Sequence, residues 1–167
     1  LKVDSFQSGV IPKNNYGDYP VHYSSMGQPT DTSFADLHVD GEGWIHALDS
    51  TRGRVFVYDQ DSNLLFTYGG IGTATGMFSH PVSIEKVGDE MLVLDTVDGS
   101  ITTFRITGFG LEVYKAVSLY SQGRYEEARE PFEEILKRCS HYRLAYIGLG
   151  KSALRLQDYQ EAMHFFR

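Results

Sequence analysis

The sequence predicts an α+β protein in two segregated parts, an antiparallel β part over residues 1–108 and a helical part over residues 109–167. Three observations predict it. Motifs recur after 46 residues in the first part and at a shorter interval in the second, and the net charge changes between them. The spacing of apolar residues also changes, from the period of about two typical of strands to the period of about 3.6 typical of helices. We therefore place the domain boundary near Gly108.

The charge of the chain is concentrated in the first part. Residues 1–108 hold 6 Lys and Arg against 14 Asp and Glu, whereas residues 109–167 hold 9 against 8. An acidic surface repels phosphate, so no nucleic-acid partner is expected. No apolar run approaches the roughly 18 residues of a membrane span, so none is expected within this chain. The single cysteine, Cys139, excludes an internal disulfide and a cysteine-cluster metal site.

The β part contains two copies of one motif. The residues LDS at 48–50 align with LDT at 94–96, and each copy is predicted to form three strands joined by two turns. The first copy adds an apolar run at 64–68. A four-stranded antiparallel unit that recurs after roughly 40 to 50 residues is typical of a β-propeller blade. We therefore predict blade-type sheets of a partial propeller over residues 34–107, and outer strands of a preceding blade over residues 1–33.

The first copy carries a family resemblance. Its sequence VDGEGWIHALDSTRGRVFVYDQDSNLLFTYGGIGTATGMFSHP resembles an NHL repeat, with a strand that ends in Asp, a polar turn, an RVFVYD-like strand and a G-x-F-x-x-P entry into the next blade. The segment PVSIEKVGDEMLVLDTVDGSITTFRIT is similar to a second, less typical copy, because Thr102 and Thr103 replace an apolar pair. The resemblance covers about residues 34–107 and implies propeller blades.

The helical part repeats at a different interval. The residues GRYEEA at 123–128 recur as QDYQEA at 157–162, and Phe132 recurs as Phe166 at the same offset. A helix–turn–helix unit of about 34 residues has the length of a tetratricopeptide (TPR) repeat, which this part of the chain resembles. The resemblance implies an α-helical TPR solenoid over residues 109–167, with about one and two-thirds units and four helices.

Individual residues of the helical part have expected roles. A small residue at Gly150 should let two helices approach closely, and Gly123 should form a sharp turn between helices. We expect Leu111, Phe132 and Ile135 to line the core of this part.

The TPR resemblance also implies a peptide-binding face, built by the first helix of each unit. Its candidate residues are Tyr114, Val117, Tyr120, Ser121, Ile147, Lys151, Leu154 and Arg155. Lys151 and Arg155 are one helical turn apart and could grip a peptide carboxylate. The alternative interpretation, two solvated surface charges, stays open.

Acidic residues and histidines of the β part were weighed as catalytic or metal-binding groups. Asp49 and Asp95 recur at one place in both copies, which indicates a structural role: a carboxylate after a strand accepts backbone N–H groups of the following turn. His38 lies near Asp36 and Asp40, but no H-x-x-x-H, H-E-x-x-H or Cys–His spacing supports a metal site. We predict no catalytic residue, no cofactor and no metal.

The leading hypothesis for function is a non-enzymatic module or scaffold that binds a protein or peptide. The segment LAYIGLGKSALRLQDYQEAMHFF follows an NHL-like segment. It resembles a group of bacterial proteins that place NHL repeats before TPR units, some of which continue into membrane-spanning regions of the Yip type. This resemblance implies a fragment of a larger bacterial protein that is extracytoplasmic or is membrane-associated through regions outside this chain; a cytoplasmic location stays open. The alternative function is part of a six-bladed propeller enzyme, a lactonase or lyase, with a metal on the propeller axis. Two blades cannot close a ring, so we expect the isolated chain to associate with itself or to belong to a longer protein.

Overall fold

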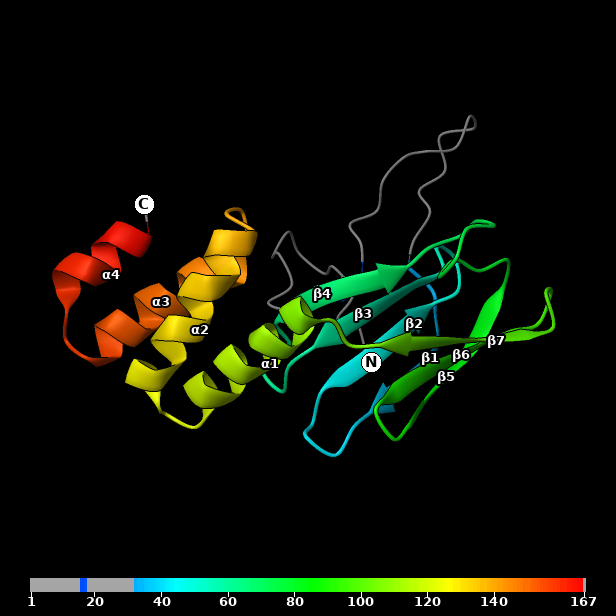
Figure 1. Cartoon of the computed structure of the whole chain (residues 1–167), viewed down its shortest axis with the longest axis horizontal. Helices are drawn as coiled ribbons and strands as arrows, with labels where there is room; N and C mark the ends of the chain where they lie inside the picture. Colours follow the sequence, from blue (N-terminus) through cyan, green and yellow to red (C-terminus); the bar gives the residue numbers. More distant parts are fainter. Residues whose placement is uncertain (1–15, 18–31, 167) are drawn as a thin grey trace, which may run out of the picture. The chain divides into compact units, whose positions relative to one another are not determined.

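The fold is given by a computed structural model that describes residues 16–17 and 32–166. The chain divides into two compact units, one that ends at Arg105 and one that begins at Ile106 (Figure 1). All described strands belong to the first unit and all described helices to the second, so the predicted α+β class in two segregated parts is confirmed. The strands expected over residues 1–33 fall almost entirely outside the described residues.

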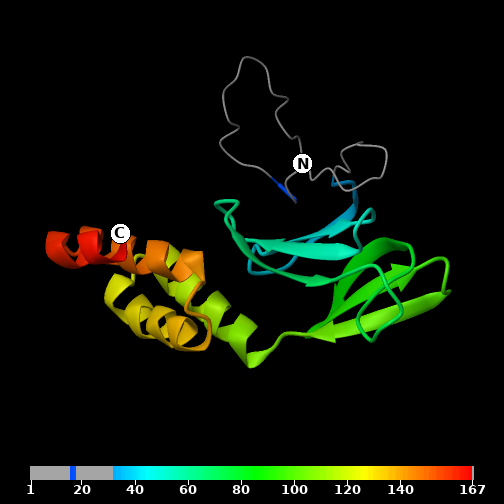
Figure 2. The ribbon, with the colours of Figure 1, turned by 90° about the horizontal axis from the view of Figure 1, so that it is seen from above.

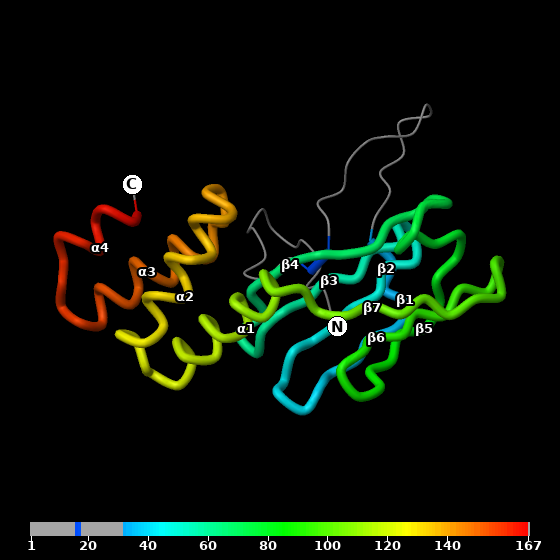
Figure 3. Tube along the Cα trace, in the orientation of Figure 1, coloured from blue at the N-terminus to red at the C-terminus, as the bar shows by residue number. Residues whose placement is uncertain are grey.

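The first unit consists of two antiparallel sheets, and each sheet is a simple meander. Sheet 1 has the order β1 (Phe34–Val39), β2 (Ile45–Asp49), β3 (Arg54–Tyr58), β4 (Leu64–Gly69). Sheet 2 has the order β5 (Pro81–Val87), β6 (Glu90–Asp95), β7 (Ser100–Arg105). The chain passes from β4 to β5 through a long loop that can be followed in Figure 3.

The repeat of 46 residues is also a repeat of strand register. Leu48 pairs with Val55 in sheet 1, and Leu94 pairs with Ile101 at the matching position of sheet 2. Their burial differs completely. Leu48 and Val55 are fully buried, whereas Leu94 is 40% and Ile101 63% exposed. These two outward-facing residues of sheet 2 have no covering layer among the described residues.

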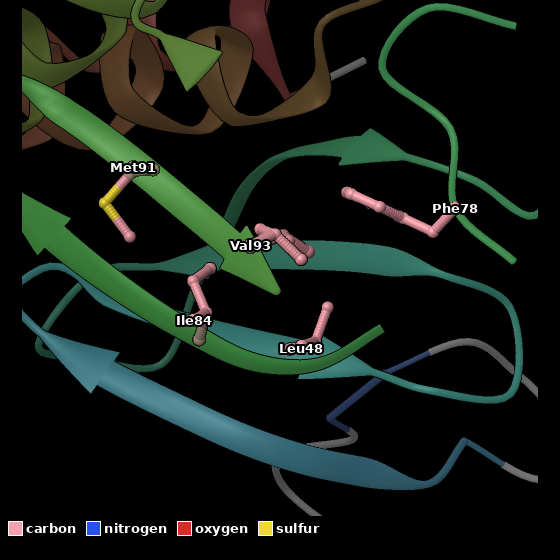
Figure 4. Packing of buried hydrophobic residues seen from close by; sticks show 6 residues of the cluster. Leu48, Phe78, Ile84, Met91 and Val93 are labelled. Atoms are coloured by element: carbon pink, nitrogen blue, oxygen red, sulfur yellow. The ribbon is translucent and has the colours of Figure 1, made fainter. Parts of the chain in front are cut away.

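The main core of the first unit lies between the two sheets, which Figure 2 shows as separate layers. Leu48 of sheet 1 packs in one cluster with Ile84, Met91 and Val93 of sheet 2 (Figure 4). Phe78, from the loop between β4 and β5, is fully buried in the same cluster. Burial of each such side chain stabilises the fold by roughly 1.5–3 kcal/mol, so this cluster holds the sheets together. The strands β1 and β5 also contact each other directly.

The second unit consists of four helices, α1 (Gly108–Ser121), α2 (Tyr125–Arg138), α3 (Arg143–Arg155), α4 (Tyr159–Phe165). Consecutive helices pack on one another, and α1 also contacts α3. The chain reverses in the same way after α1 and after α3. Gly123 has φ +77°, and Gln157, which occupies the same place in the second copy of the motif, has φ +66°. The repeat in the helical sequence is therefore also a repeat of backbone conformation.

The core of the second unit differs from its prediction at one residue. Phe132 and Ile135 are buried as expected, but Leu111 is 55% exposed, so its predicted core position is wrong. Val113 and Ala116, both fully buried, form the core-facing side of α1. Residues two positions apart in a helix are separated by roughly 200° around its axis. Leu111 therefore lies on the side of α1 opposite Val113.

Two glycines of α3 allow close approach of other helices. A Cβ atom added to Gly150 would lie 2.6 Å from the ring of Phe166, in agreement with the expected small residue at this position. The sequence analysis did not single out Gly148, yet a Cβ there would lie 2.4 Å from the ring of the buried Phe132. Because real Cβ atoms do not approach other atoms so closely, a side chain at either position would require the facing aromatic ring to move.

Candidate functional site

The candidate peptide-binding face lies on α1 and α3, two helices in contact with each other. We name it the α1–α3 face. Its residues differ in exposure. Val117 is buried, and three residues are half-buried: Tyr114, Tyr120 and Ile147. The exposed residues are Ser121, Lys151, Leu154 and Arg155. The exposed residues that are long enough to reach a ligand all come from the C-terminal half of α3.

The α1 side of this face is largely engaged in the fold. The side chain of Val117 is 7% exposed and belongs to the core. The ring of Tyr120 packs against that of Tyr125 of α2, with the centroids 5.4 Å apart. The hydroxyl of Ser121 donates a hydrogen bond to the carbonyl oxygen of Ser118 in its own helix, at 2.9 Å. These three residues therefore stabilise the helical unit whether or not a ligand is present.

The α3 side carries two cations without partners. Lys151 and Arg155 are exposed, and neither side chain forms an ion pair or hydrogen bond with another described residue. They lie one turn apart, so both can reach one anionic group. Leu154, 48% exposed, adds an apolar contact beside Arg155. Arg155 also lies in the last turn of α3, where a cation interacts favourably with the helix dipole even without a ligand.

In the β unit, Asp49 and Asp95 occupy equivalent positions at the ends of β2 and β6. Oδ1 of Asp49 accepts hydrogen bonds from the backbone N–H groups of Ser33 and Thr51, at 3.1 and 2.9 Å. Oδ1 of Asp95 accepts from the N–H group of Val97 at 2.9 Å. The prediction that these carboxylates accept backbone N–H groups in the following turn is therefore confirmed.

Asp95 makes the more complete set of hydrogen bonds. Besides Val97, the N–H groups of Asp98, Ser79 and His80 donate to its carboxylate. Burial raises the pKa of Asp95, but these backbone hydrogen bonds outweigh burial and hold the pKa below its usual value. A carboxylate that is ionised, buried and surrounded by four fixed donors serves as a turn anchor and has no lone pair directed to a substrate.

A polar ladder that the sequence analysis did not predict joins the two sheets. Three side chains of β1 and its end, Asp36, His38 and Asp40, each meet a residue of β5. We name these contacts the β1–β5 ladder. The signal in the sequence was the alternation of polar residues at 36, 38 and 40, which places all three on one face of a strand. Their partners could not be identified without knowing that β5 lies beside β1.

The first rung of the ladder is Asp36. Its Oδ2 accepts hydrogen bonds from the hydroxyl of Ser83 and the backbone N–H of Ile84, at 2.8 and 2.9 Å. Burial raises the pKa of Asp36, and the hydrogen bonds from Ile84, Ser83 and Leu37 lower it by more, so the net pKa lies below its usual value. The second rung pairs Nδ1 of His38 with Oε1 of Glu85 at 3.3 Å.

The third rung is an ion pair between Lys86 and Asp40. Oδ2 of Asp40 accepts from Nζ of Lys86 at 2.8 Å, while Oδ1 accepts the backbone N–H groups of Glu42 and Trp44. Burial raises the pKa of Asp40, but Lys86 and the two N–H groups together hold the pKa below its usual value. Both oxygens of this carboxylate therefore accept hydrogen bonds from groups of the protein itself.

His46 lies next to this ion pair and is the most unusual polar group of the unit. It is 4% exposed, and neither ring nitrogen has a hydrogen-bond partner among the described residues. Nε2 lies 4.0 Å from Oδ2 of Asp40. Burial lowers the pKa of His46 to about 4, against a smaller opposing effect of the Asp40 charge. The imidazole is therefore neutral at physiological pH.

These contacts bear on the metal site that was weighed for His38, Asp36 and Asp40. Each of the three side chains already meets a residue of β5. Within residues 16–17 and 32–166, no group of three or more His, Cys, Asp or Glu side chains is arranged to hold a metal ion. Over the same part of the chain, none of the helices combines the length and the apolar character that a bilayer crossing requires.

Comparisons with known proteins do not add a relative. No model of a known protein family matches the chain, and no curated protein matches it.

Proposed function

We propose that this chain is a non-enzymatic module that binds a protein or peptide, in which NHL-type propeller blades precede TPR helices. The repeats support the two finer fold assignments: the strand register of sheet 1 recurs in sheet 2, and the helical turn at Gly123 recurs at Gln157. We further propose that the chain is a piece of a larger bacterial scaffold at the membrane, on its extracytoplasmic side. The order of the two repeat types in the sequence supports this part of the proposal.

One observation carries the binding function. Lys151 and Arg155 project from one side of α3, exposed and without an anionic partner in the described chain. Two other exposed cations of the helical unit are neutralised by neighbours, since Arg124 pairs with Glu127 and Lys137 pairs with Glu134. Lys115, Arg138 and Arg143 are also exposed without an ion pair to a described residue, but they lie outside the α1–α3 face. Two unpaired cations one turn apart form a site for a carboxylate, which a guanidinium can bind through two parallel hydrogen bonds.

The ligand class follows from the side chains around these cations. Leu154 is 48% exposed and Ile147 is half-buried on the same helix, so an apolar side chain of the ligand would find contacts beside the carboxylate site. The ligand that fits is an extended peptide segment with an acidic residue or a free C-terminal carboxylate next to an apolar residue. Binding of this kind depends on few side chains, so affinity should be sensitive to single substitutions.

The experiment is a binding titration of a fluorescent library of short peptides that end in an acidic or C-terminal carboxylate beside Leu, Ile or Phe. Affinities are compared for the wild type, Lys151→Ala and Arg155→Ala. Hydrogen bonds to charged groups contribute roughly 1.5–3 kcal/mol, so each substitution should weaken binding about tenfold or more. Higher salt should weaken binding of the wild type as well.

Lys115→Ala is the matched control. Lys115 is also an exposed lysine of the helical unit without an ion-pair partner in the described chain, but it lies outside the α1–α3 face. Its loss should leave the affinity unchanged within a factor of about two. The proposal is wrong if no peptide of this class binds, or if the control weakens binding as much as Lys151→Ala does.

A further inference from the structure

In the part of the chain that the structure describes, the two sheets differ by one strand, and one edge of β7 has no neighbouring strand. The register match of Val55 with Ile101 makes β3 and β7 equivalent strands. In sheet 1, β3 has a neighbour on both sides, since β2 and β4 pair with it. In sheet 2, β7 pairs with β6 alone, and no described strand lies along its other edge. Among the described residues, the backbone N–H and C=O groups of that edge therefore face no other strand.

The open edge of β7 has none of the usual features that prevent strand pairing. Its sequence SITTFR contains no proline and no lysine, and its only charge, Arg105, is the last residue. Its pairing with β6 runs without a bulge, whereas the pairing of the other outer strand, β4, shifts register between Val57 and Tyr58. Bulges, prolines and charges are the features that natural proteins place on edges to prevent association. By this criterion β7 is the more receptive edge.

We propose that a second copy of this chain supplies the missing strand, by antiparallel pairing of β7 with β7 around a two-fold axis. Such an interface is self-complementary by symmetry. In an antiparallel ladder, two directly opposed residues form one of two kinds of pair. Either both direct their N–H and C=O groups toward the partner strand, or both direct them away from it. The two-fold axis must therefore lie between one residue and the same residue of the second copy. At the centre of β7 this residue is Thr102 or Thr103. Opposed threonines are a favourable cross-strand pair.

The side chains of β7 fit this arrangement. Ile101, 63% exposed, would face Thr103 or Arg105 of the second copy and lose part of its contact with water. Asp98 precedes β7 and Arg105 ends it, so antiparallel pairing brings the opposite charges of the two copies close to each other at both ends. The net charge of −7 on each chain opposes association. The dimer should therefore be weak in dilute buffer and stronger when salt screens this repulsion.

Cysteine cross-linking of the full chain tests the pairing. The variants are Thr102→Cys and Thr103→Cys, each in a Cys139→Ser background that removes the one native thiol. Opposed residues of antiparallel strands have Cα atoms about 4.5–5.5 Å apart, which a disulfide can bridge. One of the two variants should form a covalent dimer within minutes of mild oxidation. The control is Thr67→Cys, an exposed position on β4, which should remain monomeric under the same conditions.

Sedimentation of the chain with its native cysteine reduced gives a second measurement. The dimer fraction should rise with protein concentration and with salt, and Ile101→Lys should shift the dissociation constant upward by at least tenfold while the circular dichroism spectrum stays unchanged. The proposal is overturned if the chain stays monomeric up to several hundred micromolar, or if Thr67→Cys cross-links as fast as both β7 variants. It is also overturned if the β7 edge is protected from hydrogen exchange in the monomer, because another segment of the same chain then occupies it.

Discussion

Nζ of Lys86 lies 2.8 Å from Oδ2 of Asp40, whose side chain is only 2% exposed. The contact joins β5 to the end of β1 and is shorter than the 3.3 Å contact of His38 with Glu85 in the same β1–β5 ladder. Because the carboxylate of Asp40 is buried, loss of its partner should cost the fold more free energy than the same loss would at a surface carboxylate. The side chain of Lys86 itself is 32% exposed.

Lys86→Met should lower the free energy of unfolding of the β unit by about 2 kcal/mol. Methionine keeps the apolar stem but leaves the Asp40 carboxylate buried and unpaired. Loss of one partner of a fully buried pair costs roughly 3–5 kcal/mol, and the partial exposure of Lys86 reduces this value. Urea unfolding can be followed by the fluorescence of Trp44, the single tryptophan of the chain. The control Glu90→Gln, which removes the exposed pair with Arg105, should cost less than about 1 kcal/mol.

Acid should destabilise the β unit through His46. The folded-state pKa of His46 is lowered from 6.5 to about 4, so between these values the unfolded chain binds a proton that the folded chain does not. The stability that depends on neutral His46 is therefore fully present above about pH 6.5 and is lost progressively as the pH falls toward 4. At pH 5 the expected loss relative to pH 7 is about 2 kcal/mol.

The variant His46→Leu isolates this effect, because leucine cannot bind the proton. The difference in unfolding free energy between wild type and variant, measured in urea at pH 7, 6 and 5, should change by about 2 kcal/mol over that range. The carboxylates with lowered pKa values, Asp36, Asp40 and Asp95, lose their contributions only below their unfolded value near 3.8, outside this window. A difference that stays constant with pH would show that the imidazole is not held neutral.

The two turns of the helical unit predict opposite effects of glycine. Gln157 has φ +66°, a conformation that is strained for a residue with a Cβ atom, whereas Gly123 has φ +77° at the equivalent turn. Gln157→Gly should stabilise the helical unit by about 0.5–1 kcal/mol, and Gly123→Ala should destabilise it by about 1 kcal/mol. Thermal unfolding followed by circular dichroism at 222 nm measures both. If both substitutions changed the stability of the helical unit in the same direction, the two turns would not be equivalent.

Gly148→Ala and Gly150→Ala should differ although both glycines lie in the same helix. The new methyl group at 148 meets the ring of Phe132, which is 2% exposed and confined by the core. The one at 150 meets the ring of Phe166, which is 53% exposed and can turn away. Overpacking a core costs roughly 1–3 kcal/mol, so Gly148→Ala should destabilise the unit by that amount. Gly150→Ala should be near neutral, because the better helix propensity of alanine offsets the displaced ring. Chemical unfolding of the two variants side by side decides the comparison.

Several features could be predicted from the sequence because they depend on local or repeated patterns. The alternation of apolar residues and the turn residues defined the strands, and the repeated helix–turn–helix motif defined the helical turns at Gly123 and Gln157. The role of Asp49 and Asp95 was also predictable, since each carboxylate binds the backbone only a few residues ahead. The candidate face on α3 was predicted by position along the helix, and three of its residues, Lys151, Leu154 and Arg155, are exposed, whereas its role in binding stays a prediction.

Other features depend on which segments meet, and the pattern of one segment does not contain that information. Val117 fits the α1–α3 face by its position but is buried against neighbouring helices. Lys86 was not singled out, because its partner Asp40 lies 46 residues earlier in the chain. Leu111 is apolar at a plausible helical position, and only the packing of α1 shows that it faces away from the core.

The sequence by itself determined the kinds of element, their order and their two repeat lengths, because hydrogen bonds within hairpins and helices connect residues that are close in the chain. The tertiary structure decided which faces of these elements are buried. Leu48 and Leu94 occupy the same place in the repeat, yet the first is fully buried and the second is 40% exposed. The physical reason is that burial belongs to a pair of surfaces: the side of sheet 1 that carries Leu48 packs on sheet 2, whereas the outward side of sheet 2 has no partner among the described residues.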